Sequence, residues 1–126
     1  MHNPIQAVHT YMAAINTLDA DAYAACFTDN AEIHEPVGAP PARGRDGARA
    51  FMGQFAPLID RIYIRAGKLH LAGDQVAFTW ALEATGKNGR TAFADGIDIM
   101  HFSADGRIDR IQGHWDAASF AMALNA

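Results

Sequence analysis

The sequence is poor in cysteine and in positive charge, and both shortages exclude functions. The single cysteine among 126 residues, Cys26, rules out a disulfide within the chain and favours a reducing compartment. Only 10 Lys and Arg residues are present, they are scattered, and the net charge is −4. The basic stripe that nucleic-acid binding requires is therefore lacking. No apolar run approaches the ~20 residues that span a bilayer. We expect a cytoplasmic protein with neither a nucleic-acid nor a membrane partner.

Motifs for metals, phosphates and export are also lacking. The six histidines show no HxH, HxxxH or HExxH spacing, and no cysteine cluster accompanies them. The "GRDG" stretch does not match a phosphate-binding loop. Residues 1–12 have no basic region followed by an apolar run, so no signal peptide is expected. We expect no metal and no cofactor.

The composition is that of one folded domain. Half of the residues (50%) are hydrophobic, which argues against disorder. The length lies in the range of about 100–150 residues in which single domains cluster. Nothing repeats and no linker-like tract divides the chain. We expect a single domain over residues 1–126.

Helical periodicity is confined to the N-terminal half of the sequence. An Asn3-Pro4 pair is typical of a helix start, and apolar residues then recur at helical spacing from Ile5 to Ile15. The "GAPPARGRDG" stretch is rich in glycine and proline and predicts a loop. These patterns predict helices over about 3–18, 20–27 and 48–55, with a strand over 31–35 before the loop.

From residue 61 the apolar period changes to two. Val76, Phe78, Trp80 and Leu82 alternate with smaller or polar residues, as on a strand with one buried face. "GKNG" and "SADG" are typical of hairpin turns. Helices followed by an antiparallel meander predict an α+β domain. The expected strands lie at about 61–71, 75–85, 91–102 and 107–115.

Asp98 is the most unusual residue of these strands. The "GIDIMHF" stretch encloses it between apolar neighbours, and no Lys or Arg lies within seven residues. A buried carboxyl either finds a cation or raises its pKa and stays protonated. A protonated acid in a dry place donates a hydrogen bond that can stabilise an oxyanion. The alternative is an ordinary aspartate on the solvent face.

Two further residues are candidates for the same chemistry. Glu35 ends the predicted strand at 31–35, before Pro36 and small residues where a pocket mouth could form. Tyr11 lies on the apolar side of the first helix and should point inward. Taken singly, Glu35 fits a surface carboxylate and Tyr11 fits core packing.

Four stretches carry a resemblance to a known family. "TYMAAIN", "IHEPVGAPP", "GIDIMHFSADGRI" and "GHW" occur in an order and spacing that resemble bacterial ketosteroid isomerases (steroid Δ5-3-ketoisomerases). These enzymes belong to the SnoaL-like, nuclear transport factor 2-like superfamily. The resemblance covers residues 4–116. It implies a cone-shaped α+β barrel, with three N-terminal helices packed in a curved, mostly antiparallel sheet, and a homodimer.

The resemblance also implies roles for individual residues. Tyr11 matches the family's oxyanion-hole tyrosine and Asp98 its protonated oxyanion-hole aspartic acid, which that family keeps neutral. Glu35 stands where the family has its general base, an aspartate. Trp115 matches an aromatic residue beside the base. Met52 replaces a tyrosine that supports the oxyanion-hole tyrosine in the family.

The implied function is that of a cofactor-independent isomerase. It would convert a 3-oxo-Δ5-steroid, or a similar small apolar β,γ-unsaturated ketone, to the conjugated ketone through a dienolate. The ligand would need an apolar slot. Candidates for its walls, for most of which ordinary core packing is the alternative, are Phe27, Val37, Phe51, Met52, Phe55, Phe78, Trp80, Met100 and Trp115.

Two other classes of function stay open. The same scaffold carries polyketide cyclases of the SnoaL type, dehydratases and epoxide hydrolases, and fold does not fix function. His34 and His114 could supply extra acid–base groups, but we expect them to point away from Glu35 and Trp115. The second class is a non-catalytic module that binds a hydrophobic ligand or mediates dimerisation.

Overall fold

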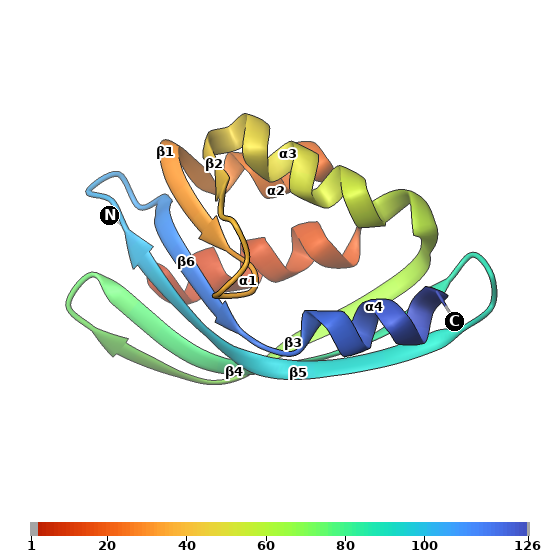
Figure 1. Ribbon diagram of the computed structural model, residues 1–126. Coiled ribbons are helices and arrows are strands. Elements are labelled where there is room, and N and C mark those ends of the chain that lie inside the picture. The colour runs from red at the N-terminus through yellow and green to blue at the C-terminus, as the bar shows by residue number, and fades with distance from the viewer. Residues whose placement is uncertain (1–2, 126) are drawn as a thin grey trace.

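The computed structural model describes residues 3–125. Four α-helices, a short 3₁₀ helix and six strands follow one another within these residues (Figure 1). In chain order the elements are α1 (Pro4–Asn16), α2 (Ala20–Ala25), β1 (Phe27–His34), β2 (Ala42–Arg43), α3 (Gly44–Phe55), η1 (Ala56–Leu58), β3 (Ile59–Ala72), β4 (Gln75–Gly86), β5 (Thr91–Phe102), β6 (Ile108–His114) and α4 (Ala117–Asn125).

All six strands described form one bent sheet in the order β2-β1-β6-β5-β4-β3. β3 to β6 make the expected antiparallel meander, and β1 pairs with β6 in parallel. The sheet curves around α1, and α2 and α3 cover its open side (Figure 1). The expected α+β fold with a curved, mostly antiparallel sheet is confirmed, and the sheet does not close into a complete barrel.

Local sequence explains the start of the first two helices. The Asn3 side chain accepts a hydrogen bond from the Gln6 N–H at 3.1 Å, and Pro4 follows as the first helical residue. The Asp19 side chain caps α2 by accepting from the Ala22 N–H at 3.0 Å. The apolar face of α1 is buried against the sheet, as the helical spacing predicted.

The structure corrects two predicted boundaries. α3 begins at Gly44 rather than at residue 48, and β1 begins at Phe27 rather than at residue 31. Gly44 has φ +66°, and a Cβ there would lie 2.7 Å from the Asp29 carbonyl oxygen. A glycine is therefore needed at position 44 both because α3 approaches β1 closely there and because the chain turns with a positive φ. β1 starts early because Phe27 pairs with Ile108 on β6.

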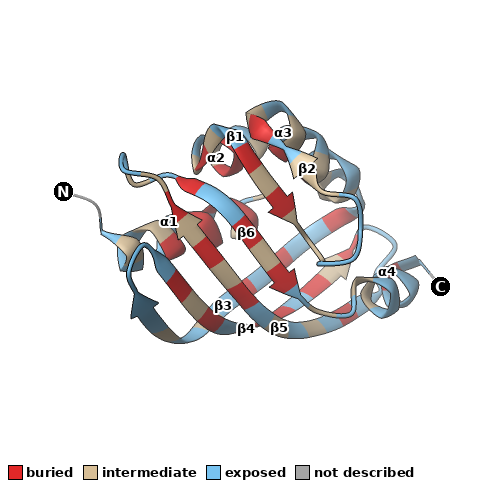
Figure 2. Cartoon of the chain, turned by 60° about the vertical axis from the view of Figure 1, so that its left-hand side comes forward, coloured by how far each residue is buried: buried red, intermediate tan, exposed pale blue. Residues whose placement is uncertain are grey.

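Inner and outer residues alternate along the meander (Figure 2). On β4 and β5 the even-numbered positions from Val76 to Leu82 and from Asp98 to Phe102 are buried. α4 follows β6 and packs against β5 (Figure 1), and it was not expected from the sequence. No helix within residues 3–125 has the length and apolar character needed to cross a membrane.

Candidate active site

A cavity of about 340 Å³ lies between the helices and the inner face of the sheet. Such a volume is within the range of small-molecule sites. Its walls are mostly apolar and come from α1, α3, β3, β4 and α4. Four residues that can donate or accept protons also line it, namely Tyr11, Tyr23, Glu35 and Asp98.

Glu35 and Tyr11 are in direct contact. Glu35 follows the last residue of β1, and the Tyr11 hydroxyl on α1 donates to its Oε2 at 3.3 Å. Although the residue as a whole is partly exposed, Glu35 Oε1 is buried and has no hydrogen-bond partner among the described residues. The carboxyl group therefore faces the interior.

Asp98 is buried from the middle of β5, with 1% of its surface exposed. The Trp80 indole N–H on the neighbouring strand β4 donates to Asp98 Oδ1 at 2.9 Å. Within residues 3–125 no Lys, Arg or His forms an ion pair with it. Burial raises the pKa of Asp98 to about 7, and the Trp80 hydrogen bond opposes part of that rise.

Gly113 shows that the two carboxyl groups are neighbours. It pairs with Asp98 across β5 and β6, and its carbonyl accepts from the Val37 N–H just after Glu35. A Cβ at Gly113 would lie 1.4 Å from Glu35 Oε1 and 2.9 Å from Asp98 Oδ1. Only a glycine leaves room for both carboxyl oxygens at this point.

The proximity of the two acids governs their protonation. The pKa of Glu35 lies well above its usual range, first because of burial and then because of the charge on Asp98. The hydrogen bond from the Tyr11 hydroxyl opposes that rise. Two buried carboxyls so close together do not both ionise readily, so the pair retains one proton near neutral pH. Such a pair can accept a proton at one oxygen and donate one at another.

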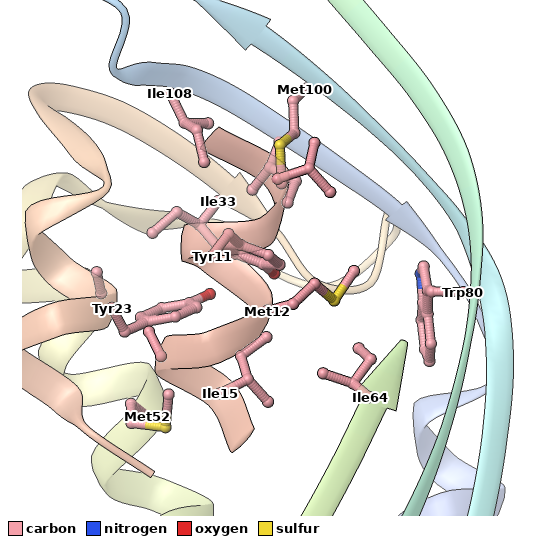
Figure 3. Packing of buried hydrophobic residues seen from close by; sticks show 14 of the residues in the cluster. Tyr11, Met12, Ile15, Tyr23, Ile33, Met52, Ile64, Trp80, Met100 and Ile108 are labelled. Atoms are coloured by element: carbon pink, nitrogen blue, oxygen red, sulfur yellow. The ribbon is translucent and has the colours of Figure 1, made fainter. Parts of the chain in front are cut away.

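Both tyrosines at the cavity remain neutral donors. Burial raises the pKa of Tyr11 and of Tyr23 well above 10, and the charges on Glu35 and Asp98 add to the rise. Their rings pack against each other with centroids 5.5 Å apart. Figure 3 shows the hydroxyl end of Tyr23 directed toward α1, the helix that carries Tyr11.

The structure therefore brings together the three residues that the sequence singled out for chemistry. Tyr11, Glu35 and Asp98 come from α1, the end of β1 and β5, and they meet at one end of the cavity. Trp115, the proposed aromatic neighbour of the base, also lines the cavity, and its indole ring lies 5.5 Å from that of Trp80.

The proposed walls divide into two groups. Phe51, Phe55, Trp80 and Trp115 line the cavity. Five others do not line it, and the expectation that they form its walls is corrected. Val37 is 44% exposed on the loop after β1. The other four are fully buried in the packed core and do not line the cavity: Phe27, Met52, Phe78 and Met100. Figure 3 shows Met52 and Met100 among the side chains of this core.

Several features of the site have no signal in the sequence pattern. The Trp80–Asp98 hydrogen bond depends on two strands being adjacent. Phe120 and Leu124 reach the cavity from α4, which lies beyond the matched motifs. Tyr23 lies on a helix whose apolar face was recognised, but its hydroxyl was not assigned a role.

The histidines near the site do not line the cavity, as expected. His34 Nε2 lies 3.1 Å from Glu32 Oε1, and His114 is exposed. No cluster of three or more His, Cys, Asp or Glu side chains suited to a metal ion occurs in the part of the chain that the structure describes.

The family model for the SnoaL-like domain matches residues 8–111. The chain belongs to this SnoaL-like family. A protein named Steroid Delta-isomerase from Nocardioides simplex is 28% identical over 109 residues, which are 86% of each chain. Enzymes are thus among the relatives of this SnoaL-like protein.

Two solved structures are informative neighbours. The epoxide hydrolase/cyclase-like enzyme SalBIII, described in pyran ring formation in the polyether salinomycin, is 27% identical with a TM-score of 0.80, covering 91% of this chain and 92% of its own. The Δ5-3-ketosteroid isomerase from Mycobacterium sp. has a TM-score of 0.81 at 19% identity, covering 94% and 96% of the two chains. The second likeness concerns the fold alone.

Proposed function

We propose that this SnoaL-like protein is a cofactor-independent isomerase of a β,γ-unsaturated ketone, with a 3-oxo-Δ5-steroid as the type substrate. The observation that carries the proposal is the meeting of Tyr11, Glu35 and Asp98 at one end of an apolar cavity. The reaction needs a base beside a ketone and donors for the oxygen that becomes negative. An apolar cavity suits such a ligand because water would weaken every one of these hydrogen bonds.

Glu35 is the proposed base. It removes a proton from the carbon between the ketone and the double bond, and returns it two carbons further along the conjugated system. The electron pair of the broken C–H bond moves onto the ketone oxygen to form the dienolate and later returns to carbon. Its raised pKa brings Glu35 closer to neutral pH, where a base is most effective.

Tyr11 and protonated Asp98 are the proposed donors to the ketone oxygen. The Tyr11 proton is directed to Glu35 in this structure, so a bound ketone has to compete for it. The side chain of glutamate is one methylene longer than that of aspartate, which lets its carboxyl reach the phenol. Removal of a donor of this kind typically costs about 10²–10³ in rate.

The proposed working state places the shared proton on Asp98. The Tyr11 hydroxyl lowers the pKa of Glu35 and the Trp80 indole lowers that of Asp98, so each carboxyl receives one hydrogen bond. The reaction itself selects the arrangement, because isomerisation needs an ionised base at Glu35 and a neutral donor at Asp98. Asp98 Oδ1 accepts from Trp80, which leaves Oδ2 to carry the proton and to donate it to the ketone.

The test is direct. Purified protein mixed with 5-androstene-3,17-dione should develop the ultraviolet absorbance of the conjugated enone. Glu35→Gln should abolish it, and Tyr63→Phe, on the exposed face of β3, should leave it unchanged. Absorbance that rises no faster than in buffer would reject steroid isomerisation.

The adjacency of the two carboxyls supports a second candidate, an epoxide hydrolase or cyclase. Glu35 and Asp98 crowd the same point above Gly113, and SalBIII is 27% identical over most of the chain. In that reaction the carboxylate removes the proton of an attacking hydroxyl, whose oxygen bonds to an epoxide carbon. The epoxide C–O bond breaks, and the neutral acid gives its proton to the oxygen released.

Asp98→Asn separates the two candidates. An isomerase needs only a neutral donor at position 98, and an asparagine N–H still donates to the dienolate. We expect isomerisation to fall by about tenfold, less than the 10²–10³ expected for Asp98→Ala. An epoxide opening needs a proton that is transferred, which an amide cannot supply. Ring opening of a hydroxy-epoxide by the wild-type protein, lost completely in Asp98→Asn, would favour the second candidate.

A further inference from the structure

The Tyr23 hydroxyl is buried at the cavity without a use in the mechanism above. Tyr23 lies on α2 with 1% of its surface exposed, and it lines the cavity. Its hydroxyl has no hydrogen-bond partner among residues 3–125. A buried hydroxyl left unpaired destabilises the folded protein, so we expect a group in the cavity to pair with it.

Aromatic neighbours hold the ring of Tyr23 in place, whereas its hydroxyl has no hydrogen-bond partner among residues 3–125. It stacks on Phe51 with centroids 6.1 Å apart and an interplanar angle of 22°, and packs edge-on against Phe27 at 5.1 Å. Packing on both sides fixes the direction of the phenol. The hydroxyl is therefore positioned in advance, which reduces the entropy lost when a ligand pairs with it.

The other donors at this end of the cavity are mostly engaged. The Tyr11 hydroxyl donates to Glu35, and the Trp80 indole N–H donates to Asp98. Among the cavity-lining residues of the described chain, the Tyr23 hydroxyl and the Trp115 indole N–H are the buried donors without a partner. Burial first, and then the charges on Glu35 and Asp98, raise the pKa of Tyr23, while the adjacent Tyr11 hydroxyl, which donates to Glu35, lowers it. Tyr23 therefore lies within electrostatic reach of the two acids and stays a donor.

We propose that Tyr23 is a ligand-binding residue whose hydroxyl donates a hydrogen bond directly to an oxygen of the bound molecule. Tyr23 and Tyr11 then form a pair of phenols that engage the same ligand oxygen from α2 and α1. The inference deepens the proposed function and rests on it only in requiring that the cavity binds an oxygen-bearing apolar ligand. The proposal adds Tyr23, a residue of α2, to the binding site.

The proposal restricts the ligand. An oxygen that accepts from both phenols and from protonated Asp98 must offer three lone pairs, as an enolate or a phenolate oxygen does, whereas a ketone oxygen accepts from two of these donors. An ammonium group offers none and would leave both phenols unpaired. A purely hydrocarbon ligand would do the same, so the site should prefer an oxygen-bearing ring to the same ring without oxygen.

The test compares 2-naphthol with naphthalene, two probes that differ by one oxygen. Binding of each is measured by probe fluorescence to the wild-type protein, to Tyr23→Phe and to Tyr63→Phe. Tyr63 is the matched control because it is 57% exposed. Tyr23→Phe should weaken 2-naphthol binding by about tenfold and change naphthalene binding by less than about twofold. Tyr63→Phe should change neither.

A second comparison separates direct contact from an effect through Tyr11. In a Tyr11→Phe background, a directly contacting Tyr23 still contributes, so Tyr11→Phe/Tyr23→Phe should bind 2-naphthol several-fold more weakly than Tyr11→Phe alone. Equal affinities of these two variants would show that Tyr23 only positions Tyr11 and would overturn the proposal. Equal losses for both probes would do so too, because they indicate packing.

Neither probe undergoes isomerisation, so the result is independent of catalysis. A preference for 2-naphthol that disappears in Tyr23→Phe supports the proposal even if no ketone is isomerised. A wild-type protein that binds naphthalene as tightly as 2-naphthol overturns it, even if the enone forms. Because phenylalanine keeps the ring, thermal unfolding of Tyr23→Phe should occur at or above the wild-type temperature.

Discussion

The inside of the bent sheet has a filled end and a hollow end. At the filled end, Val76 on β4 pairs with Met100 on β5 and Phe78 pairs with Asp98, and Val76, Phe78 and Met100 are buried without lining the cavity. At the hollow end, Trp80 and Leu82 on the same strand β4 line the cavity. The two strands thus change from core to binding surface within a few residues.

Asp98 lies at the boundary between these two ends. Met100 on one side of it belongs to the filled end, while Trp80, across the sheet, lines the cavity. Close packing on one side of the Asp98 carboxyl excludes water from it, and the cavity on the other side gives a ligand access to it. A raised pKa on a group that a ligand can reach is typical of functional sites, and this boundary provides both.

Loss of the base should have the largest effect. Glu35→Gln removes the proton acceptor at the hollow end and leaves the filled end intact. We expect the isomerisation rate to fall by about 10³-fold or more, since general-base catalysis contributes about 10²–10⁴. The matched control is Glu32→Gln on the outer face of β1, which should change the rate by less than about threefold. A Glu35→Gln protein that keeps a tenth of the activity would contradict the role.

The buried acid should make stability depend on pH. Because the pKa of Asp98 is raised to about 7 in the folded protein, the folded state binds more protons than the unfolded chain between about pH 4 and 7. The free energy of unfolding should therefore fall as the pH rises through that range, by up to about 4 kcal/mol, and the Asp98 contribution should level off above it.

Denaturant unfolding across this pH range measures the slope. Asp98→Asn should remove the part of this pH dependence that comes from Asp98 and leave the part that comes from Glu35. Asp95→Asn, at an exposed position on the same strand, should leave the slope unchanged. Stability that is flat or rises between pH 4 and 7 in the wild-type protein would mean that Asp98 is hydrated.

Filling the space between the two acids should impair catalysis more than folding. A Cβ at Gly113 would lie 1.4 Å from Glu35 Oε1, so Gly113→Ala must displace the base. A misplacement of about one ångström can cost about 10²-fold in rate, and we expect a loss of that size. Gly53→Ala is the control, because a Cβ there meets nothing within 4 Å. Similar rates for both variants would show that Glu35 is mobile.

A matched pair of isoleucines tests the difference in packing. Ile108 at the filled end is 1% exposed, and Ile62 on the cavity wall is 9% exposed. Ile108→Ala should reduce the free energy of unfolding by about 2–5 kcal/mol, whereas Ile62→Ala should cost less because its side chain already borders empty space. Equal losses, measured by denaturant titration, would argue against a hollow end in solution.

Much of the fold could be predicted because it follows from local periodicity. The alternation on β4 and β5 predicted both strands to within a residue. It left open whether Asp98 faces solvent, and the structure shows that it lies on the buried face. Helical spacing predicted that Tyr11 points inward. The boundaries that failed are those at which a partner elsewhere in the chain decides the outcome. Phe27 joins a strand only because Ile108 pairs with it.

Within the site, the sequence identified groups but not their partners. Nothing along the chain indicates that Trp80 donates to Asp98, because the two residues are 18 positions apart and the register between β4 and β5 decides their contact. The same holds for Gly113, which separates Glu35 and Asp98 only because β6 pairs with β1 and with β5. α4 and the unpaired hydroxyl of Tyr23 emerge only from the packed structure.

The sequence by itself determined which faces of the main helices and strands are apolar and which residues are candidates for chemistry, since periods of two and 3.6 assign faces without reference to the rest of the chain. Only the tertiary structure decided that two carboxyls share one proton and that a second phenol is directed at the same cavity. Hydrogen bonds and charge interactions act over a few ångströms, so strand register and helix packing must be in place before such groups affect one another.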